Sequence, residues 1–250
     1  KYYCKTEVKR LLIEDIDYNK LLDRKPIQLD LCNIKDFFLN KQILITGGTG
    51  SIGSEIIRQL LNLGLYNLII FDNSECGIFN LKNEIRNDYG IGITNSSIQF
   101  ILGDIRDKNR LENIFLKNKI KLVFHAAAYK HVPLLEYFPE ESIKTNIIGT
   151  KNIADISLQY KIDKFIMIST DKAVNPTNIM GSCKRIAELY INNLNNNKFN
   201  CEFVTTRFGN VLGSNGSVIP TFLKKINENQ DLCVTHRDIT RYFMTIPESA

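Results

Sequence analysis

The sequence predicts an α/β fold: a doubly wound parallel sheet forming a Rossmann-like domain, with part of a small substrate-binding lobe at the C-terminus. Short apolar runs alternate with helix-forming segments, which is typical of βαβ units. A glycine-rich turn directly follows the first complete strand of this pattern. Of the 250 residues, 44% are hydrophobic, which is enough for one sizeable core.

We divide the chain into three parts. Residues 1–40 are a charged lead-in segment in which we expect one or two short helices and a linker. Residues 41–210 form the dinucleotide-binding domain, and residues 211–250 begin the smaller lobe. In that last part, residues 221–227 predict a helix and the apolar run near 232–235 predicts a short strand.

The composition argues against several classes of protein. The net charge is +5, but the lysines are dispersed, so we predict no nucleic-acid partner, and a phosphorylated small molecule suits the same balance. Six cysteines form no CxxC pair, which argues against a zinc site or disulfide framework and for a reducing compartment. No apolar run approaches the roughly 20 residues of a membrane span. Because the chain starts with Lys1, we expect it to be a piece of a longer protein.

The first predicted strand, residues 42–46, leads into the turn GGTGSIG and then into a predicted helix over 54–63. Glycines let the backbone turn tightly and approach a pyrophosphate, and the start of the helix presents N–H groups to the phosphates. We therefore predict that this turn binds a dinucleotide through Gly47, Gly50, Ser51, Ile52 and Gly53.

The second predicted strand, residues 68–71, ends in Asp72, nineteen residues after Gly53. A carboxylate at this place accepts hydrogen bonds from a ribose and repels a 2′-phosphate, which favours NAD over NADP. An ordinary turn residue at the end of a strand is the alternative for Asp72. We predict NAD as the cofactor, with Asn73 and Ser74 beside it.

The same pattern continues, so that six strands precede Asn210. The later strands are predicted at 98–102, 122–124, 165–168 and 203–206, and the helices at 80–89, 109–119, 139–160 and 179–194. Polar motifs follow these strands: GD (103–104), HAAAYK (125–130), STDK (169–172) and RFGN (207–210). Because ligands bind at the carboxyl edge of an open α/β sheet, we predict that these motifs form one site.

The stretch STDKAVNPTNIMGSCKR, residues 169–185, is central to that site. It places two hydroxyls, a carboxylate and an amine directly after a strand. In the helix that follows, Asn178 is the predicted N-cap, and Met180 and Lys184 share one face. From these residues alone, a polar loop capped by a surface helix is as good an interpretation as an acid–base site. For His125 we favour a structural role with its ring nitrogens hydrogen-bonded.

Several motifs resemble those of the extended short-chain dehydrogenase/reductases that act on nucleotide sugars. They are TGGTGSIG, GDIRD, HAAAYKHVPLLE, TNIIGT, STDKAVNPTNIMGSCKR, RFGNVLGSNGSVIP and TRYFM. Within that superfamily the chain is most similar to the long UDP-N-acetylglucosamine 4,6-dehydratases of bacterial polysaccharide and glycan synthesis, from about Arg24 to its end. The resemblance implies a lyase that uses NAD to convert a UDP-N-acetylhexosamine into a UDP-4-keto-6-deoxy sugar, and a homo-oligomer.

The resemblance also implies a location. Long members of this family carry an N-terminal membrane region, and RKPIQLD (24–30) is similar to their lead-in. We therefore expect the protein at the cytoplasmic face of the bacterial inner membrane, attached through a region upstream of a soluble chain.

One position departs from the wider superfamily, whose active site carries Tyr-x-x-x-Lys. Here Met180 occupies the tyrosine position, and a thioether cannot transfer a proton. The proton must then go elsewhere, and Asp171 and Lys172 are the nearest candidates. The resemblance implies that Lys172 is the general base at sugar carbon 5 and Asp171 the general acid at the carbon 6 hydroxyl. It also implies that Thr170 binds the carbon 4 oxygen and Lys184 the nicotinamide ribose. An acid role for Asp171 requires a raised pKa, which a close ion pair would oppose.

The predicted site thus has three sets of residues and no metal. The catalytic set is Thr170, Asp171, Lys172, Met180 and Lys184. The cofactor set is Gly47, Gly50, Ser51, Ile52, Gly53, Asp72, Asn73, Ser74, Asp104, Ile105, Ala126, Ala127, Ala128 and Lys184. The substrate set is Lys130, His131, Asn146, Asn210, Ser217 and Arg241. Asn146 resembles a position that braces the active site, and a helix-surface amide is its alternative.

Two other functions stay open. A nucleotide-sugar 4-epimerase would use the same cofactor, but epimerisation needs no acid–base pair aimed at carbons 5 and 6. A non-catalytic fragment that binds NAD or a nucleotide sugar is the other, and Met180 keeps it open.

Overall fold

The computed structural model describes residues 17–22, 24, 27, 31–90, 97–196, 201–234, 236 and 238–250. The chain forms two compact units. The larger unit comprises the described residues between 29 and Phe208, together with Ala250. The smaller unit comprises the described residues up to Ile27, together with those of Gly209–Ser249. Most of the predicted lead-in, including RKPIQLD apart from Arg24 and Ile27, lies outside the described residues. Its end forms helix α1 (Leu31–Phe38), which belongs to the larger unit, and our three-part division stays a prediction.

The larger unit is built on a six-stranded sheet in the order β3–β2–β1–β4–β5–β6, with every neighbouring pair parallel. The strands are β1 (Gln42–Thr46), β2 (Leu68–Asp72), β3 (Ile98–Leu102), β4 (Ile120–His125), β5 (Lys164–Thr170) and β6 (Glu202–Phe208). The direction of winding reverses between β1 and β4, which makes this the topological switch point. The predicted doubly wound α/β fold is confirmed.

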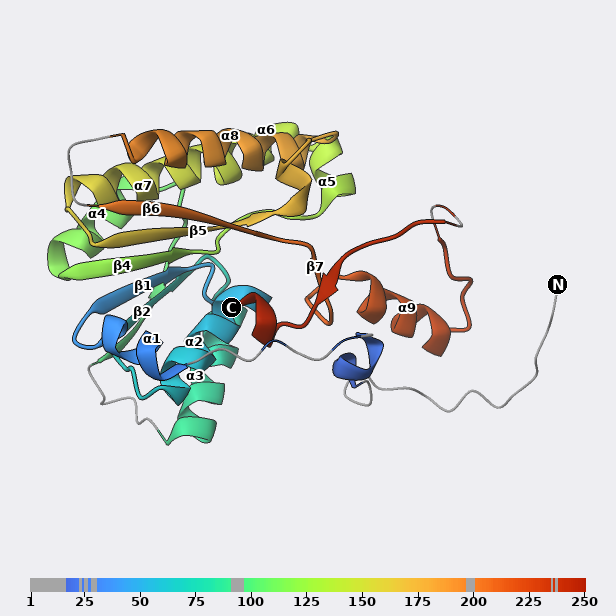
Figure 1. Ribbon diagram of the computed structural model, residues 1–250, viewed down its shortest axis with the longest axis horizontal. Helices are drawn as coiled ribbons and strands as arrows, with labels where there is room; N and C mark the ends of the chain where they lie inside the picture. The colour runs from blue at the N-terminus through green and yellow to red at the C-terminus, as the bar shows by residue number, and fades with distance from the viewer. Residues whose placement is uncertain are drawn as a thin grey trace. The chain divides into compact units, whose positions relative to one another are not determined.

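Helices cover both faces of this sheet (Figure 1). Helices α2 (Ser51–Asn62) and α3 (Glu75–Tyr89) pack on one face, and α4 (Lys108–Lys117), α7 (Thr150–Gln159) and α8 (Ile179–Leu194) pack on the other. Successive residues of β1 point to opposite faces: Ile43 and Ile45 join the α2–α3 side, and Leu44 joins the other. Burial on both faces explains why the strands are apolar almost throughout.

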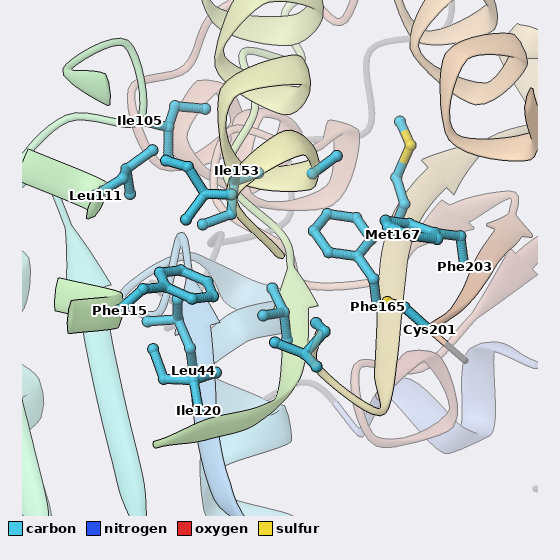
Figure 2. Close-up of a cluster of buried hydrophobic side chains, with 14 of the residues drawn as sticks. Leu44, Ile105, Leu111, Phe115, Ile120, Ile153, Phe165, Met167, Cys201 and Phe203 are labelled. Atoms are coloured by element: carbon cyan, nitrogen blue, oxygen red, sulfur yellow. The ribbon is translucent and has the colours of Figure 1, made fainter. Parts of the chain in front are cut away.

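Figure 2 shows the cluster beneath α4, α7 and α8. Phe165 of β5 and Phe203 of β6 lie side by side, with their ring centroids 5.4 Å apart, and Ile153 of α7 lies in the same cluster. Burying an aromatic or aliphatic side chain of this size stabilises the fold by roughly 1.5–3 kcal/mol. The cluster therefore holds β5 and β6 firmly against the helices, and with them the residues at the carboxyl ends of these strands.

Strand β5 is longer than predicted, since Ser169 and Thr170 pair with Arg207 and Phe208 of β6. The two hydroxyls of STDK therefore belong to the strand, and the chain turns into a 3₁₀ helix only at Asp171–Ala173.

The region that we predicted as mostly helical, residues 139–160, is helical and is divided into several elements. Helix α5 (Val132–Tyr137), which we did not predict, is followed by α6 (Pro139–Ser142), a π-helical segment (Ile143–Gly149) and then α7. A π-helical segment shifts the hydrogen-bond register and is frequent at functional sites. Here it carries Asn146.

The smaller unit contains β7 (Asn210–Val211), α9 (Val218–Asn227), β8 (Phe243–Met244) and 3₁₀ turns at Tyr18–Leu21 and Pro247–Ser249. Strand β7 pairs in parallel with β8. The strand that we predicted near 232–235 is wrong over its described residues, 232–234, which form no strand and leave Leu232 and Val234 exposed. An apolar run becomes a strand only where a partner ladder exists, and in this unit the TRYFM segment provides the partner of β7.

Candidate active site

The glycine turn after β1 depends on a very close approach of two backbone segments. Gly47 has a φ of +68°, and a Cβ atom there would lie 2.5 Å from the backbone nitrogen of Ala127. A Cβ on Gly53 would lie 2.2 Å from the carbonyl oxygen of Gly47. Side chains at either position would force the turn open. With glycine at both positions, the turn leads directly into the start of α2 at Ser51, where backbone N–H groups can bind a phosphate.

Asp72 ties the turn after β1 to the turn after β2. Its carboxylate accepts hydrogen bonds from the backbone N–H of Thr49 and from that of Ser74, both at 2.9 Å. The Ser74 hydroxyl in turn caps α3 by accepting from the Gly77 N–H at 3.1 Å. Each carboxylate oxygen keeps a second lone pair, which is what a ribose hydroxyl would require. The predicted ribose position is thus preorganised by its own backbone.

Asp104, at the end of β3, is held by Arg106. The guanidinium donates from Nε to both carboxylate oxygens, at 3.0 and 2.9 Å, and also reaches Glu141 of α6 at 3.0 Å. Partial burial would raise the pKa of Asp104, but the hydrogen bonds from Arg106 outweigh it and lower that pKa, with a smaller contribution from Asn73. Ile105 between them is buried in the core, so only its backbone could contact a cofactor.

His125, at the end of β4, has a structural environment. Its Nδ1 lies 2.7 Å from the Thr46 hydroxyl and its Nε2 lies 2.9 Å from the Thr150 hydroxyl. Because Thr150 already donates its proton to the Asn146 carbonyl at 2.8 Å, we assign the ring proton to Nε2. Complete burial, assisted by the nearby Lys184 charge, lowers the pKa of His125 to about 3. The neutral ring of this β4 residue therefore joins Thr46 of β1 and Thr150 of α7, which fits the structural role that we predicted.

Asn146 also braces the loop after β4. Its side chain is fully buried, donates to the Tyr129 carbonyl at 2.9 Å and accepts from the Tyr129 N–H at 2.8 Å. A third contact joins it to the Ser142 hydroxyl at 3.3 Å. These partners occupy the amide, so the geometry fits the bracing role and not the substrate contact that we also assigned to Asn146. Lys130 and His131, further along the loop, are exposed.

Thr170, Asp171 and Lys172 form a hydrogen-bonded group at the end of β5. The Thr170 hydroxyl donates to Asp171 Oδ1 at 2.9 Å, and Lys172 Nζ donates to the same oxygen at 3.0 Å. Partial burial raises the pKa of Asp171, but the hydrogen bonds from Lys172 and Thr170 outweigh it and lower the pKa below its usual range. Our expectation of a raised pKa for this carboxyl is therefore wrong, because the close ion pair stabilises the ionised form.

The first turns of α8 pack tightly on this group. Asn178 caps the helix, as predicted, by accepting from the Gly181 N–H at 2.8 Å. A Cβ on Gly181 would lie 2.4 Å from the Lys172 carbonyl oxygen, so only glycine allows the turn after β5 to lie so close to the helix. Glu136 of α5 accepts from the Ile179 N–H at 2.7 Å and holds the start of α8 from the other side.

Lys184 lies one turn further along α8 from Met180, and both side chains are buried. The Lys184 ammonium donates to the Ile168 carbonyl of β5 at 2.7 Å. Burial lowers the pKa of Lys184 to about 8, against an opposing contribution from Glu188. The methionine offers no ionisable group at this position.

Three of the predicted substrate residues, Asn210, Ser217 and Arg241, belong to the smaller unit. Asn210 lies in β7, and Ser217 is the N-cap residue of α9, with its hydroxyl buried and unpartnered among the described residues. Arg241 donates to the carbonyl of its neighbour Thr240 at 2.8 Å. Their assignment to a substrate stays a prediction.

Sequence reasoning missed four residues that organise the site. Glu136, Arg106, Glu188 and Arg207 all make charged or capping contacts to elements far from them in the chain. Arg106, Glu136 and Arg207 stand in the quoted motifs GDIRD, HAAAYKHVPLLE and RFGN, which could have marked them, whereas Glu188 lies three residues beyond the motif that ends at Arg185.

The sequence matches the model of the protein family described as "Polysaccharide biosynthesis protein" over residues 43–250. It is 45% identical over 240 residues to the capsular polysaccharide biosynthesis protein CapD of Staphylococcus aureus, and the match covers 95% of this chain and 39% of CapD. It is also 40% identical over 214 residues to a protein named UDP-glucose 4-epimerase of Rickettsia bellii, covering 85% of this chain and 61% of that protein. The chain thus spans less than two thirds of the length of these curated relatives.

Solved structures support the fold. The X-ray structure of Pen from Bacillus thuringiensis superimposes with a TM-score of 0.78 at 37% identity, covering 85% of this chain and 64% of that one. A double mutant of DesIV (dTDP-glucose 4,6-dehydratase) from Streptomyces venezuelae, crystallised with NAD and DAU bound, has a TM-score of 0.70 at 20% identity, covering 82% of this chain and 68% of that one. At that identity DesIV shows a shared fold alone. Among the described residues, no helix combines the length and hydropathy needed to cross a bilayer.

Proposed function

The chain belongs to the polysaccharide biosynthesis protein family, and from that premise we propose that it is the catalytic part of an NAD-dependent nucleotide-sugar 4,6-dehydratase acting on UDP-N-acetylglucosamine. The observation that carries the proposal is the hydrogen-bonded group of Thr170, Asp171 and Lys172 at the carboxyl end of β5, in the same sheet edge as the glycine turn. An acid and a base side by side suit an elimination.

NAD fits the residues that are present. Glycine at positions 47 and 53 allows the tight turn that leads into the start of α2, where backbone N–H groups can bind a pyrophosphate, and Asp72 suits an unphosphorylated ribose. The NAD named in the DesIV structure supports the same choice through the shared fold. When bound, NAD supplies hydride transfer, accepting a hydride from sugar carbon 4 and returning it to carbon 6. Ser51, Ile52, Asn73, Ser74 and the alanines 126–128 would line its path along the sheet edge.

The lowered pKa of Asp171 suggests that this carboxylate acts first as a base. The carbon 4 hydroxyl would donate to the Thr170 oxygen, and Thr170 would pass its own proton to Asp171 Oδ1, to which it is already hydrogen-bonded. Asp171 then holds one proton, which it donates to the carbon 6 hydroxyl as that group leaves as water. One carboxyl thereby serves as base and later as acid, and no tyrosine is needed at position 180.

Lys172 is the base at carbon 5 in this scheme. Once Asp171 is protonated, its negative charge no longer holds the Lys172 ammonium, which favours release of a proton from the lysine and leaves a free amine to act on carbon 5. The same nitrogen returns the proton to carbon 5 after water has left. The proton that the Lys172 ammonium released at the start passes to water and is taken back from water at the end of the cycle, when Asp171 is ionised again, so protons balance. Lys184 would hold the nicotinamide ribose, with Met180 as an inert neighbour.

We propose further that Lys130, His131, Asn210, Ser217 and Arg241 contact the UDP-sugar. Their chemistry, two cations, a histidine, an amide and a hydroxyl, suits a diphosphate and sugar hydroxyls. We also propose a homo-oligomer that is attached to the cytoplasmic face of the bacterial inner membrane through a region outside this chain.

Proton NMR in heavy water tests the function directly. The protein, expressed from its complete coding sequence, is incubated with UDP-N-acetylglucosamine and NAD⁺. We expect a 4-keto-6-deoxy product that carries deuterium at carbon 5. The same test with a 5-deuterated sugar in light water should wash the label out of carbon 5.

A 4-epimerase is the second candidate, favoured by the relatives that carry the name UDP-glucose 4-epimerase. It would yield a 4-epimer with no deuterium at carbon 5, and that result would contradict the dehydratase. Binding of NAD without any turnover would instead point to a non-catalytic domain.

A further inference from the structure

Glu188 is a buried carboxylate in α8 with no role in the proposed chemistry. Its side chain has 0% exposure, and four hydrogen bonds reach it from three elements. Ser169 of β5 donates to Oε1 at 2.6 Å, Arg207 of β6 donates at 2.8 and 2.5 Å, and Arg185 of α8 donates at 3.2 Å. Burial raises the pKa of Glu188, but the bonds from Arg207 and Ser169 outweigh it, so the group stays ionised.

Lys184 and Glu188 of α8 contact successive residues of β5, directly before the reactive residue Thr170. Met180, Lys184 and Glu188 are spaced four residues apart and share one face of α8. Along β5, Ile168 accepts from Lys184 and the next residue, Ser169, donates to Glu188. The residue after that is Thr170.

Across the sheet, Ser169 pairs with Arg207, so the two main donors to Glu188 are neighbours in the ladder. A purely structural ion pair between α8 and β6 would involve Arg207 alone. The Ser169 hydroxyl adds a bond to the strand residue that directly precedes the proposed reactive hydroxyl.

The charges around Lys184 come from few groups. Glu188 is the carboxylate whose charge acts on the Lys184 ammonium, and His125 of β4 is the other titratable group that faces it, buried and neutral near pH 7. Arg185 and Arg207 form ion pairs with Glu188. Removing the Glu188 charge would therefore remove the carboxylate that offsets the charges of Lys184, Arg185 and Arg207.

We propose that Glu188, with Ser169 and Arg207, is a positioning residue that holds the end of β5 and the reactive face of α8 in register and keeps the Lys184 ammonium in place. It touches neither substrate nor cofactor and acts through Ser169 and Lys184. The proposal rests on the proposed function for its kinetic consequence only.

The first test needs no substrate. Lysine labelled with ¹³C at Cε is titrated by NMR, and the Lys184 signal is identified by its loss in Lys184→Arg. We expect Glu188→Gln, which keeps the size and can still accept from Ser169, to lower the Lys184 midpoint by about one pH unit or more. Glu84→Gln is the matched control, because Glu84 also accepts two bonds from one arginine, Arg58, and lies on α3. It should leave the midpoint unchanged.

An unchanged midpoint in Glu188→Gln, or an equal shift in Glu84→Gln, would overturn the proposal. If Glu188→Gln does not fold, the double variant Glu188→Gln with Arg207→Gln removes both charges together. It should lower the Lys184 midpoint by a smaller amount, because loss of the guanidinium charge partly offsets loss of the carboxylate.

A third variant, Ser169→Ala, keeps every charge and removes one hydrogen bond. We expect its Lys184 titration to match the wild type while kcat for dehydration falls about tenfold at unchanged KM for NAD. Unaltered kcat in an active enzyme would contradict the positioning role. If the protein shows no dehydratase activity at all, the proposed function fails while the titration still decides the coupling of Glu188 to Lys184.

Discussion

Asp171→Asn is the most direct perturbation of the proposed chemistry. The amide cannot accept the proton that Thr170 would relay, nor donate one to the carbon 6 hydroxyl. General acid–base assistance contributes about 10²- to 10⁴-fold, and Asp171 is used twice in the scheme, so we expect kcat to fall at the upper end, by about 10³- to 10⁴-fold. The measurement is the rate of 4-keto-6-deoxy sugar formation from UDP-N-acetylglucosamine with NAD⁺.

The loss should not come from unfolding. The side chains of Lys172 and Asp171 are 32% and 39% exposed, and an ion pair so open to solvent contributes less than about 1 kcal/mol. The urea midpoint should therefore change little. Asp155→Asn serves as the control, because Asp155 pairs with Lys151 on α7 at comparable exposure, 29% and 47%, and should retain full activity.

Thr170→Val separates the relay from a direct role of the carboxylate. If the carbon 4 proton passes through Thr170, this variant should lose the oxidation step to a similar extent, with no deuterium entering carbon 5. Activity of Asp171→Asn within tenfold of the wild type would refute the reasoning. If Thr170→Val is fully active and Asp171→Asn is inactive, the proton relay through Thr170 is rejected and the acid–base role of Asp171 is retained.

Three further predictions concern the cofactor and pH. Asp72→Ala should shift the ratio of NAD to NADP affinity by about tenfold toward NADP, because it removes the charge that disfavours a 2′-phosphate; equilibrium fluorescence titration with both cofactors measures this, and an unchanged ratio would reject Asp72 as the ribose residue. His125 has a folded pKa of about 3, below its unfolded value, so its contribution to stability is present above pH 6.5 and is lost as the pH falls. Compared with His125→Gln, the wild type should lose about 2 kcal/mol of unfolding free energy between pH 7 and pH 5 in urea titrations, and parallel pH curves would contradict a buried neutral ring. Lys184, with a folded pKa of about 8, binds fewer protons in the folded state, so the wild type should gain about 3 kcal/mol relative to Lys184→Met as the pH rises from 8 past 10.5, and no relative gain would mean that the ammonium is not buried.

Much of the fold could be predicted because its signals are local. The alternation of apolar strands with helices, the glycine turn and the N-cap at Asn178 each depend on residues a few positions apart, and all are present in the structure. The ends of the strands in a parallel sheet follow from the same pattern, so the sequence alone assigns these motifs to one edge of the sheet.

The elements that we missed depend on partners elsewhere in the chain. An apolar run near residue 232 has the composition of a strand, but β7 pairs with the segment at Phe243–Met244. Helix α5 was not predicted, and the π-helical segment lies within the region that we predicted as mostly helical. Asn146 in that segment is satisfied by Tyr129 from the loop after β4.

The sequence by itself determined which chemical groups this protein carries and at which edge of the sheet they lie. Only the tertiary structure decided their charge states and partners: the ion pair that lowers the pKa of Asp171, the burial that lowers that of Lys184, and the contact of Glu188 with two strands. The reason is physical. Backbone patterns arise from neighbours along the chain, whereas desolvation and Coulomb interactions depend on distances in space, between groups such as Ser169 and Arg207 that folding alone brings together.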